Sequence, residues 1–222
     1  MNRLARHLTP VLVILSCGAL PTGEAVAIEE PPYTVVDKRN GYEIRRYEPY
    51  IVAELDVAAN SEREAGGNAF RVLAAYIFGD NRQRTKMAMT VPVETSAADT
   101  AVAMSMTAPA EARADDSIFT YAFVMERKYT LDSLPEPLDS RIRIRERSAR
   151  HVAALRFSGS ARQAAYDRRR TELALALRAD RITPVSGYSL ARYNGPYTPP
   201  FLRRNEVLVD IDWPPQKTTA SR

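Results

Sequence analysis

The sequence contains few of the residues that build metal and redox sites: one cysteine and two histidines among 222 residues. A single cysteine cannot form an intramolecular disulfide, so the hydrophobic core alone must stabilise the fold. No glycine-rich phosphate loop, metal-ligand cluster or Ser–His–Asp constellation can be assembled from the sequence. Because these common signatures of enzymes are missing, we predict no catalytic or metal-ligating residue.

The first 27 residues are predicted to be a secretory signal peptide. Arg3 and Arg6 precede a largely apolar run over residues 8–20, and residues 25–27 (AVA) supply the small side chains that signal peptidase requires. The apolar run is too short to span a bilayer. We therefore expect cleavage after Ala27 and an exported protein, periplasmic or secreted, without a transmembrane segment.

A lipid anchor at Cys17 is the alternative to release. Lipoprotein signals end in a small residue before an acylated cysteine, and Ser16 precedes Cys17 here. Leu15 is a poor fit two positions before that cysteine, and the Ala-x-Ala site comes later in the chain. The pattern favours cleavage after Ala27 without a lipid anchor, and the mature chain then contains no cysteine.

The balance of charge argues against a nucleic-acid-binding surface. Without residues 1–27, 29 of the 31 basic and 26 of the 27 acidic residues remain. The basic segment 141–150 alternates arginines with Ile142 and Ile144, which predicts a strand with one solvated side rather than a phosphate-binding patch. We therefore expect no nucleic-acid partner.

Two parts of the chain, residues 40–127 and 141–212, match each other. Residues 44–45 (IR) align with residues 144–145 (IR), and each part then reaches a capping box, beginning at Ser61 or Ser160. Helices are predicted over residues 61–78 and 160–179. Further strands are predicted over residues 86–95, 102–107, 118–129, 187–193 and 206–212.

The predicted fold class is α+β. Because each part contains strands around one helix, we expect a duplicated unit that forms a distorted antiparallel β-barrel or sheet with two packed α-helices. A single domain would cover residues 28–213, and residues 214–222 would form a flexible tail.

The motif Met-x-Met-Thr-x-Pro occurs twice, at residues 87–92 and 104–109. On a strand, Met87 and Met89 would share one face with Val91 and Val93, and Met104 and Met106 would repeat that geometry. Methionine fills irregular interiors well. A Cu(I) site would need several sulfurs converging on one point, usually with a histidine. We therefore predict that the four methionines line the core or a pocket.

Five stretches together resemble the SOUL haem-binding protein family. They are residues 42–47 (YEIRRY), 76–81 (YIFGDN), 86–93 (KMAMTVPV), 157–159 (FSG) and 193–208 (YNGPYTPPFLRRNEVL). The resemblance extends over about residues 33–212. It implies a distorted antiparallel barrel with two helices, built from a duplicated unit, in agreement with the repeat.

The resemblance also implies that haem or another tetrapyrrole binds in an apolar groove between the first helix and the loop before the last strand. The corresponding residues are Phe70, Leu73, Ala74, Ile77, Tyr197, Phe201 and Arg203. The helix positions among them fit packing against the barrel equally well. Ala75 and Pro199 stand where haem-binding members have lysines, which leaves Arg71, Arg203 and Arg204 as candidate charge partners.

His151 is the alternative axial ligand for haem iron. It lies at the start of a predicted strand in the opposite half of the chain from the groove. This position favours a structural role, because a lone histidine carries little specificity.

The leading functional hypothesis is an exported, non-catalytic haem- or tetrapyrrole-binding protein that captures, buffers or delivers its ligand. One alternative is a binding module for another flat apolar small molecule. The other is an enzyme that uses a carboxylate such as Glu206 as an acid or base. The enzyme requires that carboxylate to have a raised pKa in an apolar pocket.

Overall fold

The computed structural model describes residues 28–97 and 117–214. These residues form nine strands, two α-helices and one 3₁₀ turn. In chain order they are β1 (Tyr33–Lys38), β2 (Glu43–Tyr47), β3 (Tyr50–Ala59), α1 (Glu62–Ile77), β4 (Val93–Ala97), β5 (Ser117–Val124), β6 (Arg143–Arg147), β7 (Arg150–Phe157), α3 (Gln163–Ala179), β8 (Ser189–Arg192), η1 (Pro200–Leu202) and β9 (Asn205–Asp210). Neither helix is long and apolar enough to cross a membrane.

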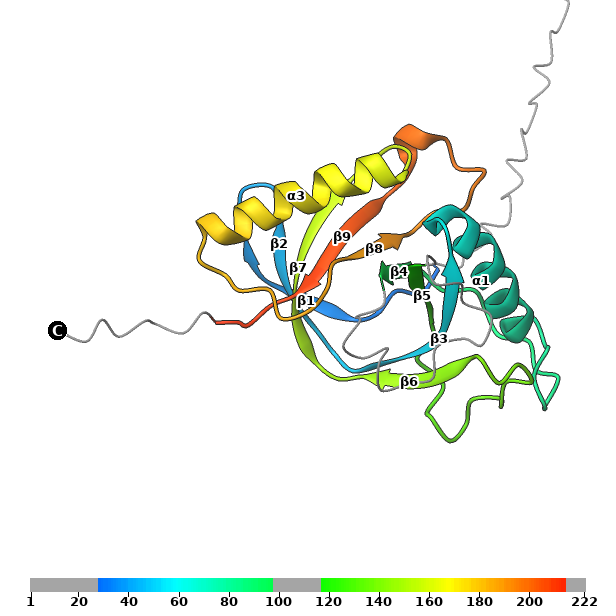
Figure 1. The fold of residues 1–222 in the computed structure, drawn as a ribbon. Coiled ribbons are helices and arrows are strands. Elements are labelled where there is room, and N and C mark those ends of the chain that lie inside the picture. Colours follow the sequence, from blue (N-terminus) through cyan, green and yellow to red (C-terminus); the bar gives the residue numbers. More distant parts are fainter. Residues whose placement is uncertain (1–27, 98–116, 215–222) are drawn as a thin grey trace, which may run out of the picture.

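All nine strands belong to one sheet with the order β1-β2-β7-β9-β8-β4-β5-β3-β6. Every neighbouring pair is antiparallel. The sheet curls into a half-barrel, and the two helices lie on its outer side (Figure 1). The predicted α+β class is therefore confirmed. The two predicted repeats meet where β4 of the first pairs with β8 of the second. In addition, β2 of the first repeat pairs with β7 of the second, and β6 of the second repeat pairs with β3 of the first. Their structural equivalence stays a prediction.

Side chains alternate between the two faces of the curled sheet, as strand geometry requires. On β3, Ala53 and Leu55 pack into the core beneath α1, whereas Val52 and Glu54 face the inner side. On β7, Ala153 and Leu155 pack beneath α3 in a second core. The apolar residues thus divide between two outer cores and a smaller inner cluster. The inner face is left with room for polar groups.

The helix starts differ from each other. The Ser61 hydroxyl accepts a hydrogen bond from the Glu64 amide at 3.3 Å, which confirms the predicted cap of α1. The start predicted at Ser160 is wrong, because α3 begins at Gln163 and its cap residue Arg162 makes no side-chain hydrogen bond. Gly159 has a φ of +103° and its amide donates to the carbonyl of Pro200. These features hold the chain outside the helical conformation next to Ser160.

The predicted strand over residues 86–95 is wrong for most of its length. Only β4 pairs in the sheet, and residues 86–92 run as irregular backbone in which the Met87 amide donates to the Ile77 carbonyl at 2.8 Å. Met87 is nevertheless buried in the core beneath α1, and Met89 packs against the same core. The predicted packing role of these two methionines is confirmed, because both contact the core, although they do not lie on a strand with alternating faces. Met104, Met106 and the predicted strand 102–107 lie outside the described residues.

The remaining predicted strands exist with different ends. The segments at 118–129, 187–193 and 206–212 overlap with β5, β8 and β9 respectively. The basic segment 141–150 contains β6 and the first residue of β7, with a break at residues 148–149.

Candidate functional site

Helix α1 presents one of its four predicted haem-contact residues to solvent. Phe70 is 44% exposed, and its ring meets Phe123 edge-on with the ring centroids 5.4 Å apart. Leu73, Ala74 and Ile77 are buried in the core between α1 and the sheet. These three residues hold the helix in place, and a ligand on the surface would meet Phe70 first. Direct contact of the three with haem stays a prediction.

The loop between β8 and β9 carries the other predicted contacts on its surface. Tyr197 is 99% exposed and Phe201 is 75% exposed. The Arg203 guanidinium lies inside the loop, where Nε and Nη2 donate to the carbonyls of Thr198 and Pro196, both at 2.7 Å. Because these acceptors are neutral, the bonds fix the position of Arg203 without cancelling its charge. Arg203 forms no ion pair with any residue that the structure describes.

The structure brings this loop towards α1. Arg192, the last residue of β8, forms an ion pair with Glu62 in the first turn of α1. The loop therefore leaves the sheet close to the start of the helix, and Phe70 lies about two turns further along it. Figure 1 shows the loop leaving β8 near the start of α1 and then rising to η1, beside the start of α3.

The candidate charge partners differ in their availability. Arg71 is exposed and has no hydrogen-bond or ion-pair partner in the described part of the chain. Arg204 instead turns to the inner face, where Nε donates to Glu206 at 3.0 Å and Nη1 pairs with Glu30 at 2.9 Å. Arg204 is thus already paired with two carboxylates, and its role as a charge partner of the ligand stays a prediction.

His151 lies on β7, opposite Arg46 of β2, and its carbonyl accepts a hydrogen bond from the Ile211 amide at 3.0 Å. Strand β7 belongs to the part of the sheet that α3 covers, away from α1. In residues 28–97 and 117–214, no three His, Cys, Asp or Glu side chains come together in an arrangement that could hold a metal ion.

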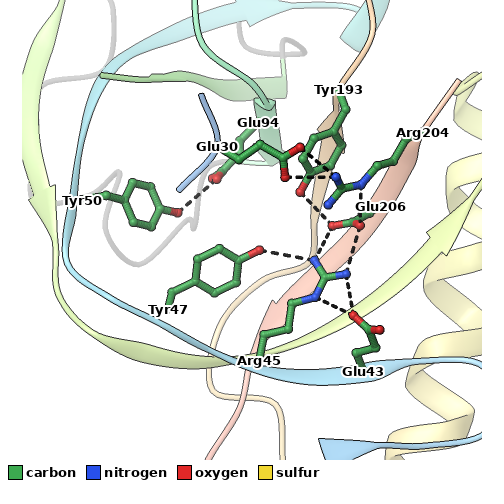
Figure 2. Close-up of polar contacts among 9 residues, drawn as sticks. All are labelled: Glu30, Glu43, Arg45, Tyr47, Tyr50, Glu94, Tyr193, Arg204 and Glu206. Atoms are coloured by element: carbon green, nitrogen blue, oxygen red, sulfur yellow. Dashed lines mark hydrogen bonds and ion pairs between the residues drawn. The ribbon is translucent and has the colours of Figure 1, made fainter. Parts of the chain in front are cut away.

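A buried polar cluster on the inner face was missed by the sequence reasoning. Glu206 on β9 has no exposed surface, and Arg45 on β2 is 3% exposed. Arg45 Nη1 and Nη2 donate to the two carboxylate oxygens of Glu206 at 2.6 and 3.1 Å, and the Tyr193 hydroxyl donates at 2.8 Å (Figure 2). Arg204 completes the surroundings of Glu206. All four residues fall within the stretches 42–47 and 193–208, and this shared location is the signal that could have found them.

The charges of this cluster keep Glu206 ionised. Burial alone would raise the pKa of Glu206, but hydrogen bonds and charge from Arg45, the charge of Arg204 and the Tyr193 hydroxyl together hold that pKa below its usual value. Burial raises the pKa of Tyr193, which therefore stays a hydrogen-bond donor. The enzyme hypothesis required a carboxylate with a raised pKa, and Glu206 has the opposite shift.

A second polar cluster lies where β3 and β6 pair. Glu54 accepts from Arg145 Nη1 at 3.1 Å, and Arg143 Nη2 pairs with Asp56 at 2.9 Å. Glu94 pairs with Arg147 and accepts from the Tyr50 hydroxyl at 3.1 Å. The arginines of segment 141–150 were predicted to form a solvated side. The prediction is wrong for Arg143 and Arg147, which are partly buried against carboxylates of the inner face.

Two hollows open on the inner face beside these clusters. The β6 hollow, of about 450 Å³, lies between β6 and the β7–β9 pair, and its arginines and carboxylates include those of the second cluster. The β2 hollow, of about 390 Å³, lies over the β1–β2 turn and β7. It is bordered by Lys38, Arg39, Arg45, Arg156, Arg204 and Glu206.

Solved structures share this fold at low sequence identity. The C-terminal domain of EcmrR superposes with a TM-score of 0.55 at 8% identity, covering 81% of this chain and 98% of that domain. An uncharacterized conserved protein from Listeria innocua superposes with a TM-score of 0.51 at 10% identity, covering 77% of this chain and 92% of that one. At such identities the likeness shows the arrangement of the elements alone.

Sequence comparison identifies the family. Heme-binding protein 2 from Homo sapiens is 28% identical over 196 residues, covering 86% of this chain and 89% of that protein. Heme-binding protein 1 from Sus scrofa is 26% identical over 187 residues, covering 82% and 93%. The family model described as SOUL heme-binding protein matches residues 28–210. The chain therefore belongs to the SOUL haem-binding protein family.

Proposed function

We propose that this chain is an exported, non-catalytic protein that binds haem or another tetrapyrrole at the surface formed by α1 and the loop over residues 193–204. Family membership supports the class of ligand, since the relatives carry heme binding in their names. Export is supported by the signal-peptide pattern of residues 1–27.

The observation that carries the proposal is the arrangement of the loop. Exposed rings of Tyr197 and Phe201 lie on the same short loop as Arg203, whose guanidinium is held in place by loop carbonyls and is unpaired with any described carboxylate. Apolar rings suit the faces of a tetrapyrrole, and a fixed guanidinium suits its carboxylates. The residues therefore fit the ligand, with Phe70 as the contact from α1.

A binding role without catalysis is supported by the inner face. A general acid or base works best when its pKa is close to the working pH. Glu206, the most deeply buried carboxylate of the inner cluster, is instead held ionised by Arg45 and Arg204. Its partners suit a structural ion pair better than proton transfer.

Absorbance titration of purified residues 28–222 with haemin, and with metal-free protoporphyrin, tests the proposal. Placing a charge on the surface, as in Phe70→Asp or Phe201→Asp, should weaken both ligands by about tenfold or more. Leu175→Asp is the matched control, because Leu175 is an exposed apolar residue on α3, the other helix. The Leu175→Asp variant should bind haemin and metal-free protoporphyrin with the same affinity as the unchanged protein.

Two further variants separate the modes of binding. Arg203→Gln should weaken both ligands, because both carry the carboxylates that Arg203 would meet. His151→Ala should bind haemin like the unchanged protein. The proposal would fail if the Phe70 and Phe201 variants bound normally, or if His151→Ala alone abolished haemin binding.

A further inference from the structure

The β2 hollow carries an excess of positive charge that the proposed tetrapyrrole surface does not use. Five cationic side chains line it, against the carboxylates of Glu43 and Glu206. Asp37 and Glu30 pair with two of these cations from outside the lining, and one positive charge still remains in excess. The β6 hollow differs, because four arginines there face four carboxylates.

The floor of the β2 hollow is fixed by ion pairs. Arg45 and Arg204 both bind Glu206, and the Arg45 guanidinium also lies 4.4 Å from the ring centre of Tyr33. Figure 2 shows Arg45 from β2 and Arg204 from the residue before β9 converging on Glu206. Because every charge in the floor has a partner, the floor is rigid and polar.

The rim of the hollow carries two cations without partners. Lys38 and Arg156 are exposed, and neither forms a hydrogen bond or ion pair with another residue in the described ranges. In the register of the sheet, the backbone of Lys38 lies opposite that of Glu43, and the backbone of Arg156 lies opposite that of Glu206. Paired residues share a face, so both side chains start from the inner face.

The two rim cations lie on opposite sides of β2. Lys38 ends β1 and Arg156 lies on β7, and β2 separates these strands. Glu43 is level with Lys38 on one side and with Ala154 on the other, and Arg156 lies two residues beyond Ala154. Two strand spacings across and two residues along therefore place the two backbones about 12 Å apart. Two long side chains at this separation can close on one small ligand placed between them.

We infer that the β2 hollow binds a small molecule with two or more negative charges, held by Arg156 and Lys38 over the Arg45–Glu206–Arg204 floor. A guanidinium recognises carboxylate or phosphate through two parallel hydrogen bonds, and the lysine adds a second point of charge. An apolar ring is a poor occupant, because it would cover the polar floor without replacing its contacts with water. Phosphate-bearing and polycarboxylate compounds share the required chemistry.

Calorimetric titration of residues 28–222 with pyrophosphate and, separately, with citrate tests this inference and distinguishes the two sources of charge. The unchanged protein should bind at least one of them, more weakly as salt is raised. The double variant Lys38→Gln/Arg156→Gln should lose about tenfold or more in affinity. Arg168→Gln is the matched control, because Arg168 is an exposed arginine of α3 with no partner in the described ranges.

The outcomes separate cleanly. Absence of binding of both anions to the unchanged protein at millimolar concentration, or equal losses in the double variant and the control, would overturn the inference. Both substituted side chains are exposed, and circular dichroism with thermal unfolding of the double variant provides an independent check that it is folded. The inference does not depend on the tetrapyrrole proposal, whose variants lie on the outer face.

Discussion

Glu206 shows how much a single buried carboxylate can determine. Its partner Arg45 is 161 positions away in the sequence, and the two meet because β2 and β9 both pair with β7. Strand periodicity assigns each side chain to a face of the sheet, but it does not say which strands are neighbours. The Arg45–Glu206 pair could therefore not be predicted, whereas the core position of Met87 could be, because methionine next to apolar residues needs no particular partner.

Removing the charge of Glu206 should destabilise the fold. Glu206→Gln keeps the shape of the side chain but leaves Arg45 and Arg204 around a neutral amide, and breaking a buried pair in this way costs about 3–5 kcal/mol. Glu172→Gln on α3 is the control, because Glu172 pairs with Arg169 at the surface and should cost less than about 1 kcal/mol. Denaturant unfolding at pH 7 measures both differences.

The same variant has a pH dependence of known sign. Because the pKa of Glu206 in the folded state lies below the ordinary value of 4.5, its contribution is complete above that value and is lost as the pH falls through the folded pKa. The stability difference between the unchanged protein and Glu206→Gln should therefore shrink in acid. A difference that stays constant through this range would show that Glu206 is not the group stabilised by Arg45.

Among the elements, helix α1 was predicted more accurately than α3, although both sequences have a capping box. Local pattern succeeds at Ser61, where the serine hydroxyl accepts the hydrogen bond from the Glu64 amide that the capping box predicts. It fails at Ser160 because Gly159 is held by long-range bonds, its amide to Pro200 and its carbonyl to the Asn205 side chain. The segment 86–92 fails for a related reason, since alternation alone provides no neighbouring strand with which to pair.

Substitution of the two serines tests this difference. Ser61→Ala removes the acceptor for the Glu64 amide and should cost about 0.5–2 kcal/mol in the free energy of unfolding. Ser160→Ala should stay within about 0.5 kcal/mol, because Arg162 is the cap residue of α3. Chemical denaturation of both variants makes the comparison, and equal losses would argue against the assigned start of α3.

At the scale of the whole molecule, the strands and the helix expected in each repeat predicted the α+β class, but the strand order had to come from the structure. The order places β2 beside β7 and β6 beside β3, so one strand of each predicted repeat pairs with a strand of the other repeat. Superposition of the described parts of residues 40–127, which are 40–97 and 117–127, on residues 141–212 is the comparison that would test the duplication. The candidate haem site was predicted only through resemblance, because Phe70 and Phe201 have no local pattern that marks them as ligand contacts.

The predicted cleavage after Ala27 has a direct test. The residues that follow it are already part of the fold, since Glu29 pairs with Arg127 at 2.7 Å and Glu30 pairs with Arg204. Amino-terminal sequencing of the exported protein should therefore read Ile28, Glu29, Glu30. A mature chain that begins at an acylated Cys17 would instead establish the lipid anchor.

The half-barrel remains open, and its open ends carry a risk of aggregation. Strands β1 and β6 end the described sheet, and each has one side without a neighbouring strand in that sheet. Such edges can recruit strands from other molecules, and charged side chains oppose this. The sequence of β6 is RIRER, and β1 ends in Asp37 and Lys38 after a register irregularity. The arginines that pair with the inner carboxylates therefore also keep one copy of the chain from adding its sheet to the next.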